Sequence, residues 1–348
     1  MPRAVTLKDI ARETGVHVST VSRALDPRAR DSLTVEVVKK VNETAQRLGY
    51  RPNRLAAGLR TKRTRTVGLI IPDITNPLFP PIVRGVESIL EPLGYVSIIV
   101  NTDGRQDRER SQMQVLLEHG VDGVVHAAME RDASHYTDLQ DRNVPIVTVN
   151  RRLDVDGLPS VVNDDAEGIH EMFRLLYEAG HRRIAHIAGP PTISTGVERL
   201  AAFREAAKAF GVSVPDAYIV ESEKFLFEEG HRCAAKLMAL ADPPTAILAA
   251  NDGLALGAIQ LLRDRGLGCP EDVSVTGFNN SDVLSLVPPG LTTVGVDKTG
   301  IGKASATLLI SRIDNPEDPE TPHLVQPIEV VIRGSIAPPP RAGRQDPL

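Results

Sequence analysis

Several short apolar runs in this 348-residue chain are followed by polar side chains of the types that bind hydroxyl-rich small molecules. Carboxylates and amides pair with hydroxyls, an arginine offers a rigid fork of donors, and a phenylalanine covers the apolar face of a sugar ring. The residues are Asp73, Asn76 and Phe79, Asn101 and Asp103, Arg151 and Arg152, and then Arg199, Phe225, Asn251, Asp252 and Asn279. Brought together, they would form a binding site for a polyol.

Two of these assignments have competing interpretations. Asp252 begins an amphipathic stretch at 252–266, so its carboxylate could serve only to cap a helix. Arg151 and Arg152 are adjacent, so one of them is expected to face solvent. The pattern alone leaves both questions open.

The usual catalytic motifs are missing from the sequence. No GxGxxG follows an apolar run, and no Walker loop, HExxH or GxSxG is present. Gly302-Lys303 lacks the upstream glycines of a phosphate-binding loop, and the nine histidines show no metal-ligand spacing. We therefore expect no enzymatic activity, no cofactor and no metal site.

The elements that must position the polar residues alternate between short β-branched runs and amphipathic stretches. Strands are predicted at 67–71, 96–100, 123–127, 146–149, 184–187, 246–249, 273–276 and 292–296, and helices at 107–119, 165–179, 194–210, 228–241 and 252–266. Such alternation is typical of parallel sheets with helices on both faces, and this many strands favours two lobes. Ligands bind outside the carboxyl ends of such strands, so the polar residues would meet in a cleft between the lobes.

Composition and charge narrow the class of protein further. The chain has two cysteines, no apolar leader and no long uncharged apolar stretch, which favours a cytoplasmic location without a membrane partner. It has no tryptophan and 3% aromatic residues, which argues against RNA binding by stacking. Residues 1–66 hold 15 Lys and Arg against 6 Asp and Glu, although the whole chain carries a net charge of −5. A basic segment of this kind favours contact with a polyanion.

The basic segment has the pattern of three short helices. The first spans 7–14 behind a capping box at Thr6, the second spans 18–25, and the third runs from the cap Thr34 to Gly49. Two short helices joined by a tight turn have helix-turn-helix form, in which the second helix meets the major groove. Its polar face carries Ser19, Ser22 and Arg23, and arginine suits the two acceptors of guanine. A small helical bundle with another role is the alternative.

The segments VTLKDIARETGVHVSTVSRAL (5–25) and LGYRPNRLAAGLRTKRT (48–64) resemble the N-terminal region of the lactose-repressor (LacI/GalR) family of bacterial transcription regulators. The resemblance implies an all-α helix-turn-helix head and an α/β periplasmic-binding-protein-like body of two parallel-sheet lobes. The implied domains are 1–52 for DNA binding, 53–65 for a hinge helix and linker, 66–335 for the two-lobed effector-binding and dimerisation body, and 336–348 for a Pro-rich tail. Three crossovers would join the lobes near Asn163, Val296 and Val325.

The resemblance also implies the DNA contacts, which are Thr6, Val18, Ser19, Thr20, Ser22, Arg23, Asn53, Leu59 and Arg60. Residues 53–60 would form about two turns of helix, which is marginal alone in water and folds only when something holds it. Leu59 matches the family's leucine that enters a base step and kinks the duplex, and Arg60 would reach a phosphate or the groove floor. The alternative is a polar tether between two domains.

For the effector, the resemblance selects eight contacts: Asp73, Asn76, Phe79, Arg152, Arg199, Phe225, Asn251 and Asn279. Asn279 departs from the family, where aspartate is frequent at this position. The amide removes a negative charge from the cleft and adds a donor. An acidic effector such as a sugar acid is one hypothesis, and a neutral sugar with altered bonding is the other.

The function implied is a sequence-specific DNA-binding transcription regulator, taken as a repressor, whose operator affinity is controlled by a sugar or sugar acid. A two-fold homodimer would read a near-palindromic operator. The alternative is a two-lobed solute-binding protein or an α/β enzyme with a helical head.

Overall fold

The computed structural model describes residues 5–25, 29, 32–50, 63–131, 144–153, 158–317, 320 and 322–340. The chain forms two compact units, the head (1–64) and the body (65–348). None of the helices in the described ranges has the length and apolar character needed to cross a membrane.

The described part of the head contains the helices α1 (Leu7–Thr14), α2 (Val18–Leu25) and α3 (Val35–Arg47). The Asp9 carboxylate accepts hydrogen bonds from the Thr6 backbone N–H (2.9 Å) and hydroxyl (2.7 Å), and Gly15 ends α1 in the left-handed conformation. The three helices pack around a small core of Ile10, Ala11, Val21, Ala24, Val41 and Ala45. The predicted helix-turn-helix is therefore present, with α2 as its second helix.

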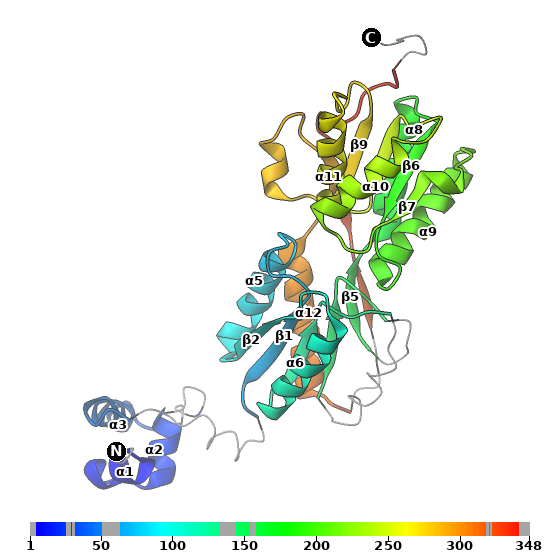
Figure 1. The fold of residues 1–348 in the computed structure, drawn as a ribbon. Coiled ribbons are helices and arrows are strands. Elements are labelled where there is room, and N and C mark those ends of the chain that lie inside the picture. Colours follow the sequence, from blue (N-terminus) through cyan, green and yellow to red (C-terminus); the bar gives the residue numbers. More distant parts are fainter. Residues whose placement is uncertain are drawn as a thin grey trace. The chain divides into compact units, whose positions relative to one another are not determined.

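The body contains two six-stranded sheets (Figure 1). Lobe 1 has the order β11-β5-β4-β3-β1-β2, in which every pairing is parallel. Its strands are β1 (Thr66–Ile71), β2 (Val96–Asn101), β3 (Gly123–His126), β4 (Ile146–Val149), β5 (Ser160–Asn163) and β11 (His323–Gln326), and its helices are α5 (Phe79–Leu90), η2 (Glu91–Leu93), α6 (Gln106–Glu118) and α12 (Lys298–Asp314).

Lobe 2 has the order β12-β10-β9-β8-β6-β7, and only the β10–β12 pairing is antiparallel. Its strands are β6 (Ile184–Ala188), β7 (Ile219–Glu221), β8 (Ala246–Ala249), β9 (Ser274–Asn279), β10 (Thr292–Val296) and β12 (Ile328–Val331). Its helices are α8 (Asp165–Glu178), α9 (Ser194–Ala209), η3 (Asp216–Tyr218), α10 (Phe227–Leu237), α11 (Asp252–Asp264) and η4 (Asp282–Ser285).

The chain passes between the lobes three times, after Asn163, after Val296 and after Gln326, close to the predicted crossovers. The second passage brings α12 back to lobe 1, where it packs against α5. The approach is close because both helices present glycines: a Cβ on Gly302 would lie 2.2 Å from the Ile82 carbonyl oxygen, and one on Gly85 would lie 2.2 Å from that of Thr299. The two lobes are thus one continuous fold rather than consecutive domains.

The structure adds four strands that the sequence pattern did not predict, β5, β7, β11 and β12. β7 has only three residues, and β11 and β12 lie toward solvent, so none of the three shows a buried apolar run. The body also continues past its expected end at 335, because the Ala337 N–H donates to the Ser274 hydroxyl (3.0 Å) and Ile336 packs on the core of lobe 2.

Candidate ligand cavity and helix-turn-helix surface

A cavity of about 270 Å3 lies where the carboxyl ends of the strands of both lobes meet. Lobe 1 lines it with Pro72, Asp73, Asn76, Leu78, Phe79, Asp103, Gly104, Glu130, Asn150 and Arg151, and lobe 2 with Pro190, Thr192, Ile193, Thr195, Arg199, Glu223, Lys224, Phe225, Leu226, Asn251 and Asn279. Seven of the eight predicted effector contacts are in this lining. The exception is Arg152.

In the loop after β1, two side chains accept hydrogen bonds from backbone N–H groups of the same loop. Asp73 accepts hydrogen bonds from the backbone N–H (2.9 Å) and hydroxyl (2.7 Å) of Thr75, and Asn76 accepts one from the Leu78 N–H (3.0 Å). Phe79 then begins α5 and is buried. The predicted residues of this loop therefore face the cavity with part of their hydrogen-bonding capacity already used.

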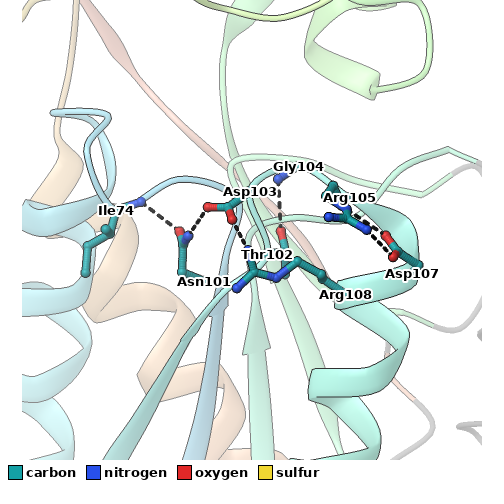
Figure 2. Close-up of polar contacts among 8 residues, drawn as sticks. All are labelled: Ile74, Asn101, Thr102, Asp103, Gly104, Arg105, Asp107 and Arg108. Carbon is teal, nitrogen blue, oxygen red and sulfur yellow. Dashed lines mark hydrogen bonds and ion pairs between the residues drawn. The ribbon is translucent and has the colours of Figure 1, made fainter.

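The loop after β2 is fastened to the loop after β1 (Figure 2). Asn101 accepts a hydrogen bond from the Ile74 N–H (2.9 Å) and donates one to Asp103, whose other oxygen pairs with Arg108. Asp103, at a positive φ of 54°, reaches the cavity, whereas Asn101 holds the two loops together. These two sequence candidates consequently have different places in the site.

Arg199 is the most deeply buried cation of the cavity, with 2% of its surface exposed. Its Nη1 donates to the Ala250 carbonyl oxygen (2.6 Å) and its Nη2 to Asp165 (2.9 Å), and its guanidinium carbon lies 3.7 Å from the centre of the Phe278 ring. Burial raises the pKa of Asp165, and the charge of Arg199 opposes that shift. The Arg199 Nε is buried and has no hydrogen-bond partner among the described residues.

The helix that follows β8 is capped by Asn251 rather than by Asp252. The Asn251 Oδ1 accepts a hydrogen bond from the Leu254 N–H (2.8 Å). Asp252 is buried, and it accepts hydrogen bonds from the Thr293 hydroxyl (2.6 Å) and the Ser281 N–H (2.8 Å). Asp252 thus ties β10 and the loop after β9 to α11, while Asn251 both caps the helix and lines the cavity. The interpretation of Asp252 as a helix cap is wrong.

Asn279 ends β9 and is buried at a positive φ of 106°. Its Oδ1 has no hydrogen-bond partner among the described residues. A buried acceptor without a partner costs free energy, so this oxygen is suited to a donor from a ligand, such as a hydroxyl.

The structure separates the two adjacent arginines after β4. Arg151 lines the cavity and donates from Nη1 to the Ala128 carbonyl oxygen (3.1 Å), and its Nε is buried without a partner. Arg152 turns to α9, where its Nε donates to Glu198 (2.6 Å). Asn150 precedes them at a positive φ of 64°, and the sequence itself holds no signal that tells the two arginines apart.

Other lining residues escaped the sequence analysis. Glu130 follows β3, Pro190 and Thr192 follow β6, and Lys224 follows β7. Each lies just beyond a strand end, where ligand contacts are expected, so the predicted strands at 123–127 and 184–187 are the signal for Glu130 and Thr192. Lys224 could not be predicted in this way, because the strand that precedes it, β7, was not predicted.

The predicted DNA contacts of the head lie on and around α2. Ser19 and Arg23 are exposed on this helix and Thr6 is exposed at the start of α1, whereas Val18, Thr20 and Ser22 are half-buried. Val18 packs against the core of the head. Asn53, Leu59 and Arg60 lie outside the described residues.

The His17 side chain caps the N-terminus of α2, a role that was not predicted from the sequence. Its Nδ1 accepts a hydrogen bond from the Ser19 N–H (3.3 Å) and lies 2.8 Å from the Ser19 hydroxyl oxygen. A ring nitrogen therefore takes the role that a serine or aspartate oxygen usually has at a helix N-terminus. The same contact fixes the Ser19 side chain on the exposed face of α2.

Comparison with known proteins agrees with these features. Residues 6–53 match the model for bacterial regulatory proteins of the lacI family, and residues 173–336 match the model for a periplasmic binding protein-like domain. Catabolite control protein A of Priestia megaterium is 34% identical over 95% of this chain and 99% of its own length.

Two solved structures extend the comparison. A complex of the transcriptional regulator CelR with cellobiose is 30% identical, with a TM-score of 0.73, over 95% of this chain and 99% of that chain. A lac repressor dimer bound to operator and the anti-inducer ONPF shares the fold, with a TM-score of 0.83 and 23% identity, over 96% of this chain and 100% of that one. The chain therefore belongs to the LacI family of bacterial regulatory proteins, whose members are DNA-binding transcription regulators rather than enzymes.

Proposed function

We propose that this protein is a transcription repressor whose affinity for operator DNA is set by a sugar or sugar acid bound in the cavity of the body. Residues 1–52 would bind the DNA, 53–65 would form the hinge helix and linker, and 66–335 would bind the effector and dimerise. The protein would act in the cytoplasm as a homodimer on a near-palindromic operator.

The observation that carries the proposal is the cavity, where a buried arginine, two buried amides and Phe225 converge from different strand ends. A polyol needs this combination: a fixed donor fork, amides for paired hydroxyls and an aromatic face for the ring. The solved structure of CelR, a relative over 95% of this chain, holds cellobiose.

On the DNA side, α2 would lie in the major groove with Ser19 and Arg23 toward the bases. Thr6, Val18, Thr20 and Ser22 would flank them, and Asn53, Leu59 and Arg60 would add contacts from the hinge. A bidentate Arg–guanine contact contributes about 1–3 kcal/mol of discrimination, so Arg23 is the residue on which sequence preference would depend most.

The effector would act by changing the relative population of open and closed lobes. Several contacts of the described residues already join the lobes. Arg152 bonds Glu198 through its side chain and the Ser194 hydroxyl through its N–H (3.0 Å), the Arg131 N–H donates to the Thr192 carbonyl oxygen (2.8 Å), and Lys298 donates to the Asn280 carbonyl oxygen (2.7 Å). A ligand that touches both lobes stabilises the closed arrangement, and typical coupling of about 1–3 kcal/mol would alter operator affinity by about 5–150-fold.

The test is selection of genomic fragments by the purified full-length protein, followed by sequencing. We expect a short near-palindromic sequence to be enriched, and Arg23→Ala to lose that enrichment while keeping salt-sensitive binding to random DNA. Enrichment without any shared sequence would contradict the proposed function. Addition of an effector that binds the protein should then change the affinity for the selected sequence. A lower affinity means that the effector releases the DNA, and a higher affinity means that it promotes binding.

A further inference from the structure

We propose that the effector is a sugar acid or related hydroxy acid whose carboxylate binds the free edge of the Arg151 guanidinium. This inference rests on the proposed function, because it names the chemical class of ligand for the same cavity.

The contrast between two arginines of the cavity is the first support. Arg199 is neutralised by the buried Asp165 at 2.9 Å. Arg151 contacts the carbonyl oxygens of Ala128 (3.1 Å) and Met129 (3.5 Å), and among the described residues no carboxylate forms an ion pair with it. The charge of Arg151 is therefore held in the wall of the cavity without a partner of opposite sign.

Burial lowers the pKa of Arg151 to about 10. The carboxylates of Glu109 and Glu130 oppose this shift, and the positive charge of Arg199 adds to it. A partly buried cation that lacks an ion pair is unfavourable, and an anion that enters with the ligand relieves this cost.

The geometry of the fork is the second support. Nη1 of Arg151 is used by the two carbonyl oxygens, whereas Nε is buried without a hydrogen-bond partner. Nε and Nη2 form the second donor pair of a guanidinium, which matches the two oxygens of a carboxylate. A hydroxyl could use one of these donors, and a carboxylate could use both.

Three of the carboxylates in the lining have hydrogen-bond or ion-pair partners of their own. Asp73 is hydrogen-bonded to Thr75, Asp103 is paired with Arg108, and Glu130 accepts a hydrogen bond from the Gln106 amide (2.5 Å). Glu223 is exposed, next to the exposed cation Lys224.

The buried amides of the lining offer a site for hydroxyls. Asn150, Asn251 and Asn279 are neutral amides, and the Asn279 Oδ1 has no described partner. A hydroxy acid would place its carboxylate on the Arg151 guanidinium and donate a hydroxyl hydrogen bond to the Asn279 Oδ1.

The experiment is isothermal titration calorimetry of the full-length protein with aldonic and uronic acids of the common pentoses and hexoses, each paired with its neutral parent sugar. We expect at least one acid to bind more tightly than its neutral partner by about 10- to 100-fold, the ratio typical of charge-assisted hydrogen bonds. Arg151→Gln should remove this advantage, Arg151→Lys should keep part of it, and Arg204→Gln, at an exposed position of α9, should leave it nearly unchanged. Thermal unfolding of the ligand-free variants establishes that each is folded.

Three results would overturn the inference. They are equal or tighter binding of the neutral sugars, an acid whose affinity is the same for Arg151→Gln, and failure of every acid to bind. The proposed function is judged separately by the selection of genomic fragments. If the protein selects an operator but responds to a neutral sugar, the proposal of an acidic effector is refuted and the proposed function as a regulator stands.

Discussion

Arg199 and Asp165 form a buried ion pair, with Nη2 2.9 Å from Oδ1 and 3% and 5% of the two side chains exposed. Asp165 begins α8 directly after the first crossover, and Arg199 lies in α9 and contacts the end of β8 through the Ala250 carbonyl oxygen. The residue that faces the ligand is thus also the residue that holds two helices and a strand end of lobe 2 in place.

Arg199→Met should therefore destabilise the body as well as weaken effector binding. Removal of one partner leaves the Asp165 carboxylate buried without its counter-charge, which typically costs about 3–5 kcal/mol. The double variant Arg199→Met with Asp165→Asn should recover a large part of this loss, because no uncompensated charge remains. Urea unfolding of the four members of the cycle measures the coupling. Additive losses would show that the two side chains do not depend on each other.

Asp252 should make the stability of the body depend on pH. Burial raises its pKa from 3.8 to about 6, while the hydrogen bonds from Thr293 and Ser281 and the charge of Lys298 oppose the shift. A raised folded-state pKa means that the folded protein binds the proton more tightly than the unfolded chain does. The contribution is fully present below pH 3.8 and is lost as the pH rises through about 6.

The expected loss across this window is roughly 3 kcal/mol for Asp252, from about 1.4 kcal/mol per pKa unit. Urea unfolding at a series of pH values measures it as the difference between the parent and Asp252→Asn, whose amide does not titrate. Asp216→Asn, which changes an exposed carboxylate, is the matched control and should follow the parent. An identical pH profile for the parent and Asp252→Asn would contradict the raised pKa.

The sequence was informative where the local structure depends on one short segment. The helix-turn-helix needs only local patterns around Thr6, Gly15 and Thr34, and the strand ends after β1, β8 and β9 follow buried apolar runs that are plain in the sequence. The cavity residues Asp73, Asn251 and Asn279 could therefore be predicted from the carboxyl-end rule.

The sequence was uninformative where the position of a residue depends on contacts with a distant segment of the chain. Arg152 faces Glu198, which is 46 positions away, so its turn away from the cavity depends on the packing of lobe 2 on lobe 1. The role of Asp252 depends on Thr293 in β10, and that of Arg199 on Asp165 beyond the first crossover. The edge strand β11 consists of His-Leu-Val-Gln, and only its pairing with β5 makes it a strand.

Arg23→Gln should reduce the affinity for the operator far more than the affinity for random DNA. A base-reading arginine contributes about 1–3 kcal/mol to discrimination, and non-specific binding depends on phosphate contacts that this change only slightly weakens. Fluorescence anisotropy with both DNAs at one salt concentration measures the two losses. Arg47→Gln on α3, which removes an exposed arginine paired with Glu13, is the control and should affect both DNAs equally. Equal losses for Arg23→Gln would reduce Arg23 to a phosphate contact.

Glu198→Gln should favour the open arrangement of the lobes and so weaken effector binding. Glu198 pairs with Arg152 across the lobes at 2.6 Å, and the Arg152 N–H also donates to the Ser194 hydroxyl (3.0 Å), so the pair has one support that the change leaves intact. A half-exposed ion pair contributes about 0.2–1 kcal/mol, which predicts up to about fivefold weaker binding. Glu178→Gln breaks a comparable pair to Arg174 within α8, at 2.7 Å, and should leave the affinity unchanged. Calorimetry with the acid that the parent binds compares the two variants, and equal affinities would mean that this contact has no part in closure.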